Sequence, residues 1–429
     1  MAFLVVLVRL GAAAPVRAVA LTVDDELARA HASADVVEFY QAREMRPFWV
    51  RSAGLPPFWT RGELRPEALQ MAKITADALP AEVTPAARAR VAQAMAAARS
   101  GRPEDLARAE VALSLALVDA VDSLRPGPEM AFVDPDLPTR PGALETLEQA
   151  ASVRELNRYL ANVAVPNPVY RDLRAAYDRY RGPDAALIQL NLQRARVLPP
   201  PTSSRFILVN PAARELTVYE DGKAKQSMRV IVGTREDATP MMAGLMRYLV
   251  FNPYWEIPVE MVKESIAPAV MRQGPGYVAN RNFQVLSDWG DDAVPLDPAA
   301  VDWPAVAGGA VELPVRQKPG GDNMMGQVKF MLPNELGIYL HDTPDRWAFG
   351  PGGGQRLMSA GCVRLERAGD LVAWLLGKDR PDPAKVGSNH RVELGQAVPV
   401  YITYLTAAPG KGGVVFHPDV YGRDVRPAR

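Results

Sequence analysis

The spacing of apolar residues changes near the middle of the chain. Between residues 24 and about 196, apolar residues recur every three or four positions, as in ELARAHASADVVEFYQAREM, LARAEVALSLALVDAVDSL and LETLEQAASVRELNRYLANV. That period is typical of helices with one buried face. Breakers such as Gly101 and Pro128 separate these stretches. The first half is therefore predicted to be a bundle of several helices.

The second half has the pattern of β-strands. A proline-rich linker at residues 199–201 is followed by RFILVN and by ELTVYEDGKAKQSMRVIVG, in which Asp221 and Gly222 separate two β-rich runs. An Asp-Gly pair in this position is typical of a hairpin turn. Further strand candidates are RYLVFN, QVKFML, GIYLH, RVEL and VPVYITYL. We therefore expect a multidomain α+β protein, with a helical domain followed by a β-rich domain.

Two helices and one irregular segment are expected to interrupt the β-rich half. One helix should follow Pro258, in VEMVKESIAPAVM. Another should cover about residues 366–376, where one face carries Ala368, Leu371, Val372 and Leu375. Residues 274–321 are rich in Gly, Pro and Asp. They predict a long irregular loop, which in a compact domain is usually functional or disordered.

The N-terminal residues have features of an export signal. MAFLVVLVRLGAAAPVRAVALTVDD contains a short apolar core and an A-x-A at residues 18–20, the kind of site that signal peptidase cuts. Arg9 and Arg17 follow the apolar core, whereas a signal peptide has its basic residues first. We expect a signal segment at residues 1–20 and a periplasmic protein, with a plain apolar terminus as the alternative. No apolar run reaches the roughly 20 residues that span a bilayer.

Composition argues against several classes of function. The 49 basic and 49 acidic residues give a formal net charge of zero, so no broad field attracts nucleic acid. A single cysteine cannot form an internal disulfide, and with four histidines it cannot supply the ligands of a typical zinc site. We expect neither a nucleic-acid partner nor a metal or other cofactor.

The single cysteine, Cys362, lies in LMSAGCVRLE. A lone cysteine is more often a small buried hydrophobe than a nucleophile. Here Ser359 and Gly361 belong to a turn of small residues, which leaves backbone N–H groups open to a reacting carbonyl. The nearest upstream histidine, His341, ends the predicted strand GIYLH and is joined to the turn by a glycine-rich loop. These residues indicate a cysteine nucleophile with a histidine base.

The motifs around these two residues resemble those of a known family. YLHDTP, followed after a loop by S-x-G-C-V-R-L, resembles the signature of the L,D-transpeptidase catalytic domain (YkuD family). Three further segments of the chain resemble successive sequence motifs of the YcbB-like branch of that family. They are LVNPAARELTVYEDGK, FNPYWEIPVEMVKESIAP and RQKPGGDNMMGQVKFMLPNELGIYLHDTP. FYQAREMRPFWV and IQLNLQRARVLP resemble the helical scaffold domain of that branch and its junction with the catalytic domain.

The resemblance implies a domain layout, and the sequence departs from the family pattern in two places. It implies a helical scaffold domain at 24–198, a catalytic domain at 202–408 with a capping insertion at about 261–316, and a C-terminal tail at 409–429. Many relatives carry SHGC where this chain has SAGC. Many also carry a peptidoglycan-binding module with a DG-x-x-G-x-x-T motif, and this motif does not occur in the sequence.

The resemblance also implies a reaction. Cys362 would attack the bond between diaminopimelate and D-Ala in a peptidoglycan tetrapeptide donor, releasing D-Ala and leaving a thioester. His341 would take the thiol proton, and the backbone carbonyl of Asp342 would orient its imidazole. The N–H groups of Gly361 and Cys362 would hold the oxyanion. A diaminopimelate amine of a second stem peptide would then form a 3→3 crosslink, in cell-wall biogenesis and the maintenance of cell shape. A carbapenem is the implied covalent inhibitor.

Four further residues are candidates for substrate binding. Ser359 lies in the turn before the cysteine, and Arg364 is suited either to a stem-peptide carboxylate or to pairing with a nearby acid. Tyr339 and Trp255 are suited to lining a groove, although aromatic residues on strands often belong to the core.

Alternative functions use the same residues differently. The same acyl-enzyme resolved by water or by a protein lysine would make an L,D-carboxypeptidase, an endopeptidase or a protein-to-peptidoglycan ligase. An inactive wall-binding scaffold would not require His341 and Cys362. A papain-like protease is disfavoured because His341 precedes Cys362 and because no helix is predicted directly after Cys362.

Overall fold

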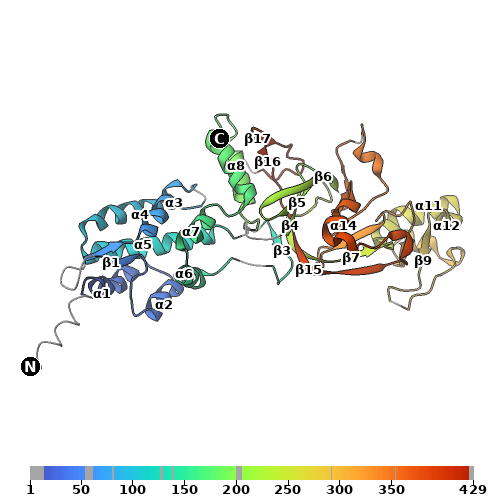
Figure 1. Cartoon of the computed structure of the whole chain (residues 1–429). Helices are drawn as coiled ribbons and strands as arrows, with labels where there is room; N and C mark the ends of the chain where they lie inside the picture. The colour runs from blue at the N-terminus through green and yellow to red at the C-terminus, as the bar shows by residue number, and fades with distance from the viewer. Residues whose placement is uncertain are drawn as a thin grey trace, which may run out of the picture. The chain divides into compact units, whose positions relative to one another are not determined.

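The structure is a computed structural model of the whole chain (Figure 1). It describes residues 14–53, 61–79, 82–125, 129–137, 140–199, 205–290, 292–352 and 354–424. Contacts divide the chain into a helical unit and a β-rich unit. The fold class predicted from the sequence, helical and then β-rich, is confirmed. Residues 1–13 of the predicted signal segment and most of the proline-rich linker lie outside the described residues.

Two short segments depart from the predicted linear order of the domains. The helical unit comprises residues 1–127, 138–202 and 407–416, and the β-rich unit comprises 128–137, 203–406 and 417–429. Strand β3 (Ala131–Phe132) therefore belongs with the β-rich unit, although it comes before the linker. The hairpin of β16 (Ala407–Gly410) and β17 (Gly413–Phe416), which lies at the start of the predicted tail, belongs with the helical unit.

The helical unit is organised around its longest described helix, α5 (Pro103–Asp122), which packs against α1, α4 and α6. Several of the helices begin with proline at one of their first two positions, where its missing N–H costs nothing. The other helices are α1 (Ala14–Arg29), α2 (Ala34–Ala42), α3 (Pro66–Asp77), α4 (Pro85–Ala97), α6 (Ala143–Ser152), α7 (Leu156–Ala164), α8 (Pro168–Arg179) and α9 (Ala185–Ala195).

A small hairpin in this unit was not predicted by the helical pattern. Strand β1 (Val50–Ala53) pairs antiparallel with β2 (Arg61–Leu64). The entry to β1 is held by Glu110 of α5, which is fully buried. Its Oε1 accepts hydrogen bonds from the Phe48 N–H (2.6 Å) and the Tyr40 hydroxyl (2.7 Å).

The other oxygen of the Glu110 carboxylate is satisfied in the same way. Its Oε2 accepts from the Trp49 N–H (2.7 Å) and the Val50 N–H (3.1 Å). Burial raises the pKa of Glu110, while the bonds from Phe48, Tyr40 and Trp49 oppose the shift. The family-like motif FYQAREMRPFWV is therefore held together by one carboxylate from a distant helix.

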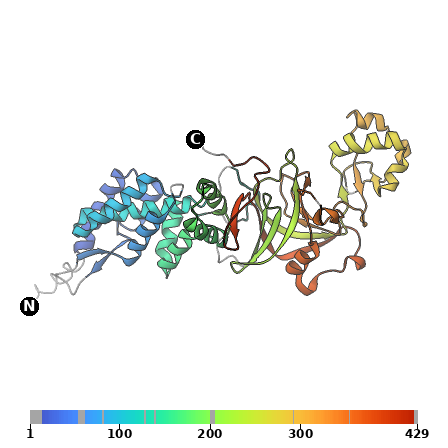
Figure 2. The same ribbon diagram turned by 90° about the horizontal axis from the view of Figure 1, so that it is seen from above.

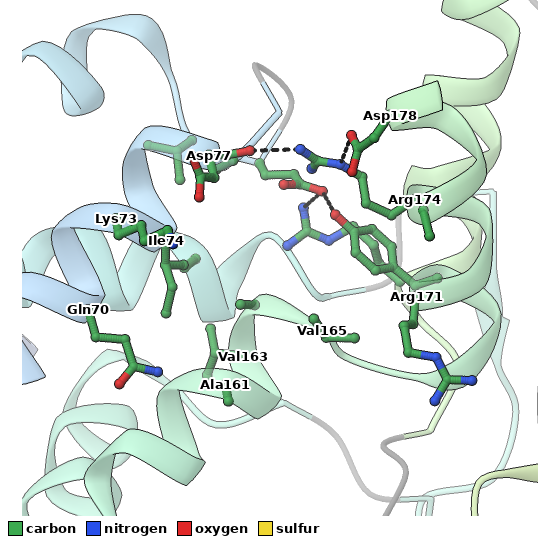
Figure 3. Close-up of a pocket in the computed structure, with 18 residues that line it drawn as sticks. Gln70, Lys73, Ile74, Asp77, Ala161, Val163, Val165, Arg171, Arg174 and Asp178 are labelled. Carbon is green, nitrogen blue, oxygen red and sulfur yellow. Dashed lines mark hydrogen bonds and ion pairs between the residues drawn. The ribbon is translucent and has the colours of Figure 1, made fainter. Parts of the chain in front are cut away.

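The helical unit also has an open cavity of about 520 Å³, lined mainly by α3, α7 and α8 (Figure 3). Arg174 links its two sides, donating to the Asp77 carbonyl (2.9 Å) and to the Asp178 carboxylate (3.0 Å). Deeper in the wall, the buried guanidinium of Arg196 lies 3.1 Å from Glu82, which also accepts from the Tyr170 hydroxyl. These polar groups largely satisfy one another.

The β-rich unit contains one main sheet. Its strand order is β11-β12-β14-β6-β5-β4-β15-β7-β3, and a further pairing of β11 with β7 closes the path into a barrel. The strands are β4 (Arg205–Asn210), β5 (Glu215–Glu220), β6 (Lys223–Gly233), β7 (Met242–Phe251), β11 (Val328–Met331), β12 (Leu340–His341), β13 (Leu357–Ser359), β14 (Val363–Leu365) and β15 (His390–Ile402).

Several sequence predictions for this unit are confirmed. Asp221 and Gly222 both have positive φ (50° and 71°) and join β5 to β6, as expected for the hairpin turn. Helix α14 (Ala368–Leu376) buries the predicted face of Ala368, Leu371, Val372 and Leu375 against the barrel core. The predicted strands RVEL and VPVYITYL form one strand, β15, with an irregularity between Glu393 and Val398.

The expectation of an irregular loop at residues 274–321 is wrong. The segment lies in an insertion that has its own core and a three-stranded sheet, β8-β10-β9 (Figure 2). The helix predicted after Pro258 is present over residues 259–273, whereas the elements between residues 274 and 321 have too few residues for a periodic pattern to show. The elements of the insertion are β8 (Trp255–Glu256), α10 (Val259–Met261), a π-helical turn (Val262–Ile266), α11 (Ala267–Gln273), α12 (Gly276–Asn280), β9 (Phe283–Val285), α13 (Trp303–Ala307) and β10 (Val315–Gln317).

No helix in the described part of the chain is long and apolar enough to cross a membrane.

The buried carboxylate of Glu110 gives a test of the helical unit. In Glu110→Gln, an NH2 group replaces one of the two accepting oxygens, so one or two buried N–H or O–H donors lose their acceptor. We expect the free energy of unfolding to fall by about 1–3 kcal/mol per lost acceptor, measured by urea unfolding followed by circular dichroism. Glu104→Gln, on the exposed side of the same helix, should change it by less than about 1 kcal/mol. Equal stability of the two variants would show that the Glu110 bonds contribute little.

Candidate active site

The strand pairing places the predicted catalytic residues on one face of the sheet. Strand β12 runs parallel to β14, with His341 opposite Arg364, and antiparallel to β11, with Lys329 opposite His341. Side chains alternate between the two faces of a strand. The intervening residues Phe330, Leu340 and Val363 belong to the barrel core. Lys329, His341 and Arg364 therefore project from the opposite face.

Cys362 and Tyr339 continue the same alternation. The Val363 N–H donates to the Tyr339 carbonyl (3.1 Å), which extends the pairing of β12 and β14 by one residue. Cys362 and Tyr339 thus lie two positions before Arg364 and His341 and project from the same side. We call the surface formed by Lys329, Tyr339, His341, Cys362 and Arg364 the cysteine face.

The turn before Cys362 has a conformation that favours glycine. Gly361 has φ +99°, and a Cβ atom there would lie 2.9 Å from Ile338 Cδ1. Its carbonyl accepts from the Thr239 hydroxyl (2.8 Å), and the buried Ser359 hydroxyl donates to the Cys362 carbonyl (2.6 Å). Within the described residues, the N–H groups of Gly361 and Cys362 donate to no acceptor. Two donors are therefore left beside the thiol.

The surroundings of Cys362 favour the protonated thiol. Its Sγ lies 3.5 Å from the Gly337 carbonyl, to which an S–H can donate. Burial raises the pKa of the thiol, although the Tyr339 N–H, Lys329 and Arg364 lower it in part. To act as a nucleophile, Cys362 would therefore need a base that takes its proton.

His341 is held as a neutral imidazole. The side chain is buried, and its Nδ1 lies 2.5 Å from the Asp342 carbonyl. A carbonyl can only accept, so Nδ1 carries the hydrogen and Nε2 keeps its lone pair. Burial, helped by the positive charge of Arg364, lowers the pKa of His341 to about 3, despite the bond to Asp342. The imidazole can therefore act as a base throughout the neutral range.

The side chain of Asp342 fixes the carbonyl that holds the imidazole. One carboxylate oxygen accepts from the Gln327 N–H (2.9 Å), and the other pairs with Arg346. Arg346 also donates to the Glu366 carbonyl (2.6 Å), just after β14. Gly326 has φ +59°, and a Cβ there would lie 2.4 Å from the Asp342 carboxylate. Asp342 is thus tied to the ends of two neighbouring strands.

The four predicted substrate-binding residues lie in different environments in the structure. Arg364 is paired with Asp345 (2.7 Å), which was one of the two alternatives, and Tyr339 lies on the cysteine face. The Ser359 hydroxyl is engaged inside the turn. Trp255 packs against the core of the insertion. Of the four, only Arg364 and Tyr339 lie on the same face as the thiol.

The described residues contain no group of three His, Cys, Asp or Glu side chains that could hold a metal ion.

Comparison with known proteins gives the family. Residues 204–402 match the family model described as the L,D-transpeptidase catalytic domain (YkuD), and residues 34–176 match a scaffold domain. Residues 204–402 form an L,D-transpeptidase catalytic domain. The family resemblance seen in the sequence is thereby confirmed.

A curated relative agrees with this family. A Haemophilus influenzae protein named "Putative L,D-transpeptidase" is 33% identical over 246 residues, which cover 55% of this chain and 48% of that protein. The match thus spans about half the length of the relative.

Solved L,D-transpeptidases are much more distant. A Mycobacterium smegmatis L,D-transpeptidase is 14% identical, covering 46% of this chain and 58% of its own, with a TM-score of 0.23. L,D-transpeptidase 3 from Mycobacterium tuberculosis is also 14% identical, covering 46% and 60%, with a TM-score of 0.22. The Ldtfm-avibactam carbamoyl enzyme is 11% identical, covering 48% and 50%, with a TM-score of 0.21.

Sequence reasoning missed several residues that shape this site. Arg346 follows Asp342 by four residues, whereas Gly326 lies far before it in the sequence and is brought beside its carboxylate only by the barrel. Lys329 was not among the predicted site residues. A signal did exist, because a lysine between apolar residues in QVKFML indicates a strand face turned away from the core.

Gly326 allows a test of the Asp342 support. In Gly326→Ala, the new methyl group should displace the Asp342 carboxylate and misalign the carbonyl that holds His341. We expect acylation of the thiol to slow by about 100-fold, measured by mass spectrometry with a carbapenem. Gly352→Ala is the control, since Gly352 also has positive φ (+81°) but nothing within 4 Å. Similar acylation rates in both variants would contradict the role of this support.

The protonation of the site can be tested directly because the chain has one cysteine. The difference in ultraviolet absorbance between the wild type and Cys362→Ser should report the thiolate alone. Since burial raises the thiol pKa from its ordinary value of 9.0, no thiolate should be detected near neutral pH. A thiolate signal that persists into the acidic range would instead indicate a resting thiolate–imidazolium pair.

Proposed function

We propose that this protein is a peptidoglycan L,D-transpeptidase that forms 3→3 crosslinks through a thioester on Cys362. The observation that carries the proposal is that a neutral imidazole, His341, and the only cysteine of the sequence, Cys362, project from the same face of the sheet. That combination suits an acyl transfer that begins from an uncharged thiol.

The first half-reaction would form the thioester. Cys362 Sγ attacks the diaminopimelate carbonyl carbon of a tetrapeptide while its proton passes to His341 Nε2. The N–H groups of Gly361 and Cys362 hold the resulting oxyanion, a role for which their lack of other acceptors suits them. When the C–N bond breaks, the leaving amine of D-Ala takes the proton from His341.

The second half-reaction would form the crosslink. A side-chain amine of a second stem peptide attacks the thioester carbonyl and gives up a proton to His341. Collapse of the intermediate breaks the C–S bond, and the proton returns to the sulfur. Water or a protein lysine in place of that amine would give the carboxypeptidase, endopeptidase or ligase activities, so the acceptor decides the product.

Export to the periplasm is part of the same proposal. It is supported by the apolar N-terminal sequence with its A-x-A at residues 18–20 and by the location of the proposed substrate outside the cytoplasm.

Carbapenem labelling tests the acyl-enzyme. We expect the intact mass to rise by one ring-opened adduct, mapped to Cys362 in the peptide LMSAGCVR, and Cys362→Ala should not label. His341→Ala should label at least about 100-fold more slowly, since a general base contributes rate factors of this order. His390→Ala is a matched control, because His390 is exposed, and should label at the wild-type rate.

The outcome of this test also separates the alternatives. Labelling of denatured and folded protein at equal rates would mean that the site is not organised for acyl transfer. If the folded protein labels, mass analysis of the products from purified tetrapeptide muropeptides then identifies the acceptor. Tripeptide products without dimers would favour the carboxypeptidase.

A further inference from the structure

The peptide group between Gly361 and Cys362 carries one of the two N–H donors that the proposed reaction uses. Its carbonyl belongs to Gly361 and its N–H to Cys362, and in a planar trans peptide these two groups point in opposite directions. The N–H has no acceptor within the described residues, whereas the carbonyl accepts from the buried Thr239 hydroxyl (2.8 Å). The hydrogen bond from Thr239 therefore fixes the direction in which the Cys362 N–H points.

Without that hydrogen bond, the orientation of this peptide would be easy to lose. Gly361 has φ +99°, and a residue without a Cβ atom can change its backbone angles at little cost. A rotated peptide would turn its carbonyl towards the space that the N–H now faces, and a carbonyl there would repel an oxyanion. Among the described residues, the Thr239 hydroxyl is the one hydrogen-bond donor to the Gly361 carbonyl.

Thr239 is itself held in one hydrogen-bonding role. It lies between β6 and β7, and its hydroxyl oxygen accepts from the N–H of Gly233 (2.9 Å), at the end of β6. A hydroxyl has one hydrogen, and an N–H can only donate, so that hydrogen is left for the Gly361 carbonyl. The N–H of Thr234 donates to the Ser359 carbonyl (3.0 Å). The same loop therefore holds both ends of the turn before Cys362.

Residues near the C-terminus hold Thr239 in turn. The Tyr421 hydroxyl donates to the Gly233 carbonyl (2.8 Å) and accepts from the Thr239 N–H (3.4 Å). Arg423 donates to the Thr239 carbonyl (3.1 Å). Tyr421 also stacks on Tyr404, with 5.4 Å between the ring centroids, and its N–H donates to the Tyr404 hydroxyl (3.0 Å). This part of the predicted tail is thus tied to the loop that contacts the turn before Cys362.

We propose that Thr239 is a positioning residue for the oxyanion site and that Tyr421 acts through it. Thr239 does not touch the substrate. It keeps the Cys362 N–H directed at the place where the oxygen of the reacting carbonyl becomes negative. The inference rests on the proposed function, in which this N–H and that of Gly361 hold the oxyanion. The loop and the C-terminal segment then contribute to the rate of acyl transfer and not to the binding of the peptide.

Two reactions of the single thiol separate this role from a general structural one. Carbapenem acylation passes through an oxyanion, whereas alkylation by iodoacetamide displaces iodide from a saturated carbon and forms none. Thr239→Val keeps the shape of the side chain without its hydroxyl. We expect its acylation to slow by about 100-fold and its alkylation to stay within about twofold of the wild-type rate. Thr239→Ser keeps the hydroxyl and should restore acylation.

A matched control and a second variant complete the kinetic test. Thr75→Val is the control, because the buried Thr75 hydroxyl in α3 also donates to a backbone carbonyl, that of Met71 (2.9 Å), and it should react like the wild type. Tyr421→Phe leaves the threonine intact but removes its support, so acylation alone should slow, by about tenfold. Circular dichroism checks that each variant is folded. Equal slowing of both reactions, or wild-type acylation of Thr239→Val and Tyr421→Phe, would overturn the positioning role.

The amide signal of Cys362 tests the orientation independently of any reaction. Because the chain has one cysteine, labelling cysteine alone with an NMR-active nitrogen isotope gives a single amide cross-peak. We expect this peak to shift or split in Thr239→Val, to return in Thr239→Ser and to stay in place in Thr75→Val. An unmoved peak in Thr239→Val would overturn the inference whether or not the protein is acylated. A shifted peak in a chain whose wild type resists carbapenem would support the hydrogen-bonded orientation and refute the proposed function.

Discussion

The hydrogen bond from His341 Nδ1 to the Asp342 carbonyl constrains the whole cysteine face. It fixes the tautomer with a neutral acceptor, so no buried carboxylate stabilises an imidazolium. The two cations on the same face, Lys329 and Arg364, disfavour a charged imidazole further. In the proposed reaction, His341 would therefore be available as a base at rest and would hold a proton only briefly, which suits its return to the leaving amine.

The same charges have a second effect on the thiol. Lys329 and Arg364 favour a thiolate, but burial outweighs them and leaves Cys362 protonated. The thiolate is the form that oxidants attack most readily. Under the proposed function, a Cys362 thiol that ionises only as it reacts would thus be protected from nonspecific oxidation.

Local patterns predicted the parts of this protein that depend on local chemistry. The Asp221-Gly222 turn and the buried face of α14 follow from residue preferences at short range. Elements of three to five residues, such as β9 and α13, are too short to show a period, which is why residues 274–321 were mistaken for an irregular loop. The hydrogen bonds of Glu110 and Asp342 join residues that are far apart in the sequence. No pattern along the chain indicates which donors a buried carboxylate will meet.

The position of β3 has a consequence for dissecting the protein. Ala131 and Phe132 pair with β7 of the barrel, and Asp134 just beyond them binds Arg247 (2.8 Å). A fragment that starts at residue 203 would leave this edge of β7 unpaired and Arg247 without its buried acid. Exposed sheet edges promote aggregation. A recombinant catalytic fragment should therefore keep residues 129–137, joined to the barrel by an engineered linker, so that the sheet retains its outer strand.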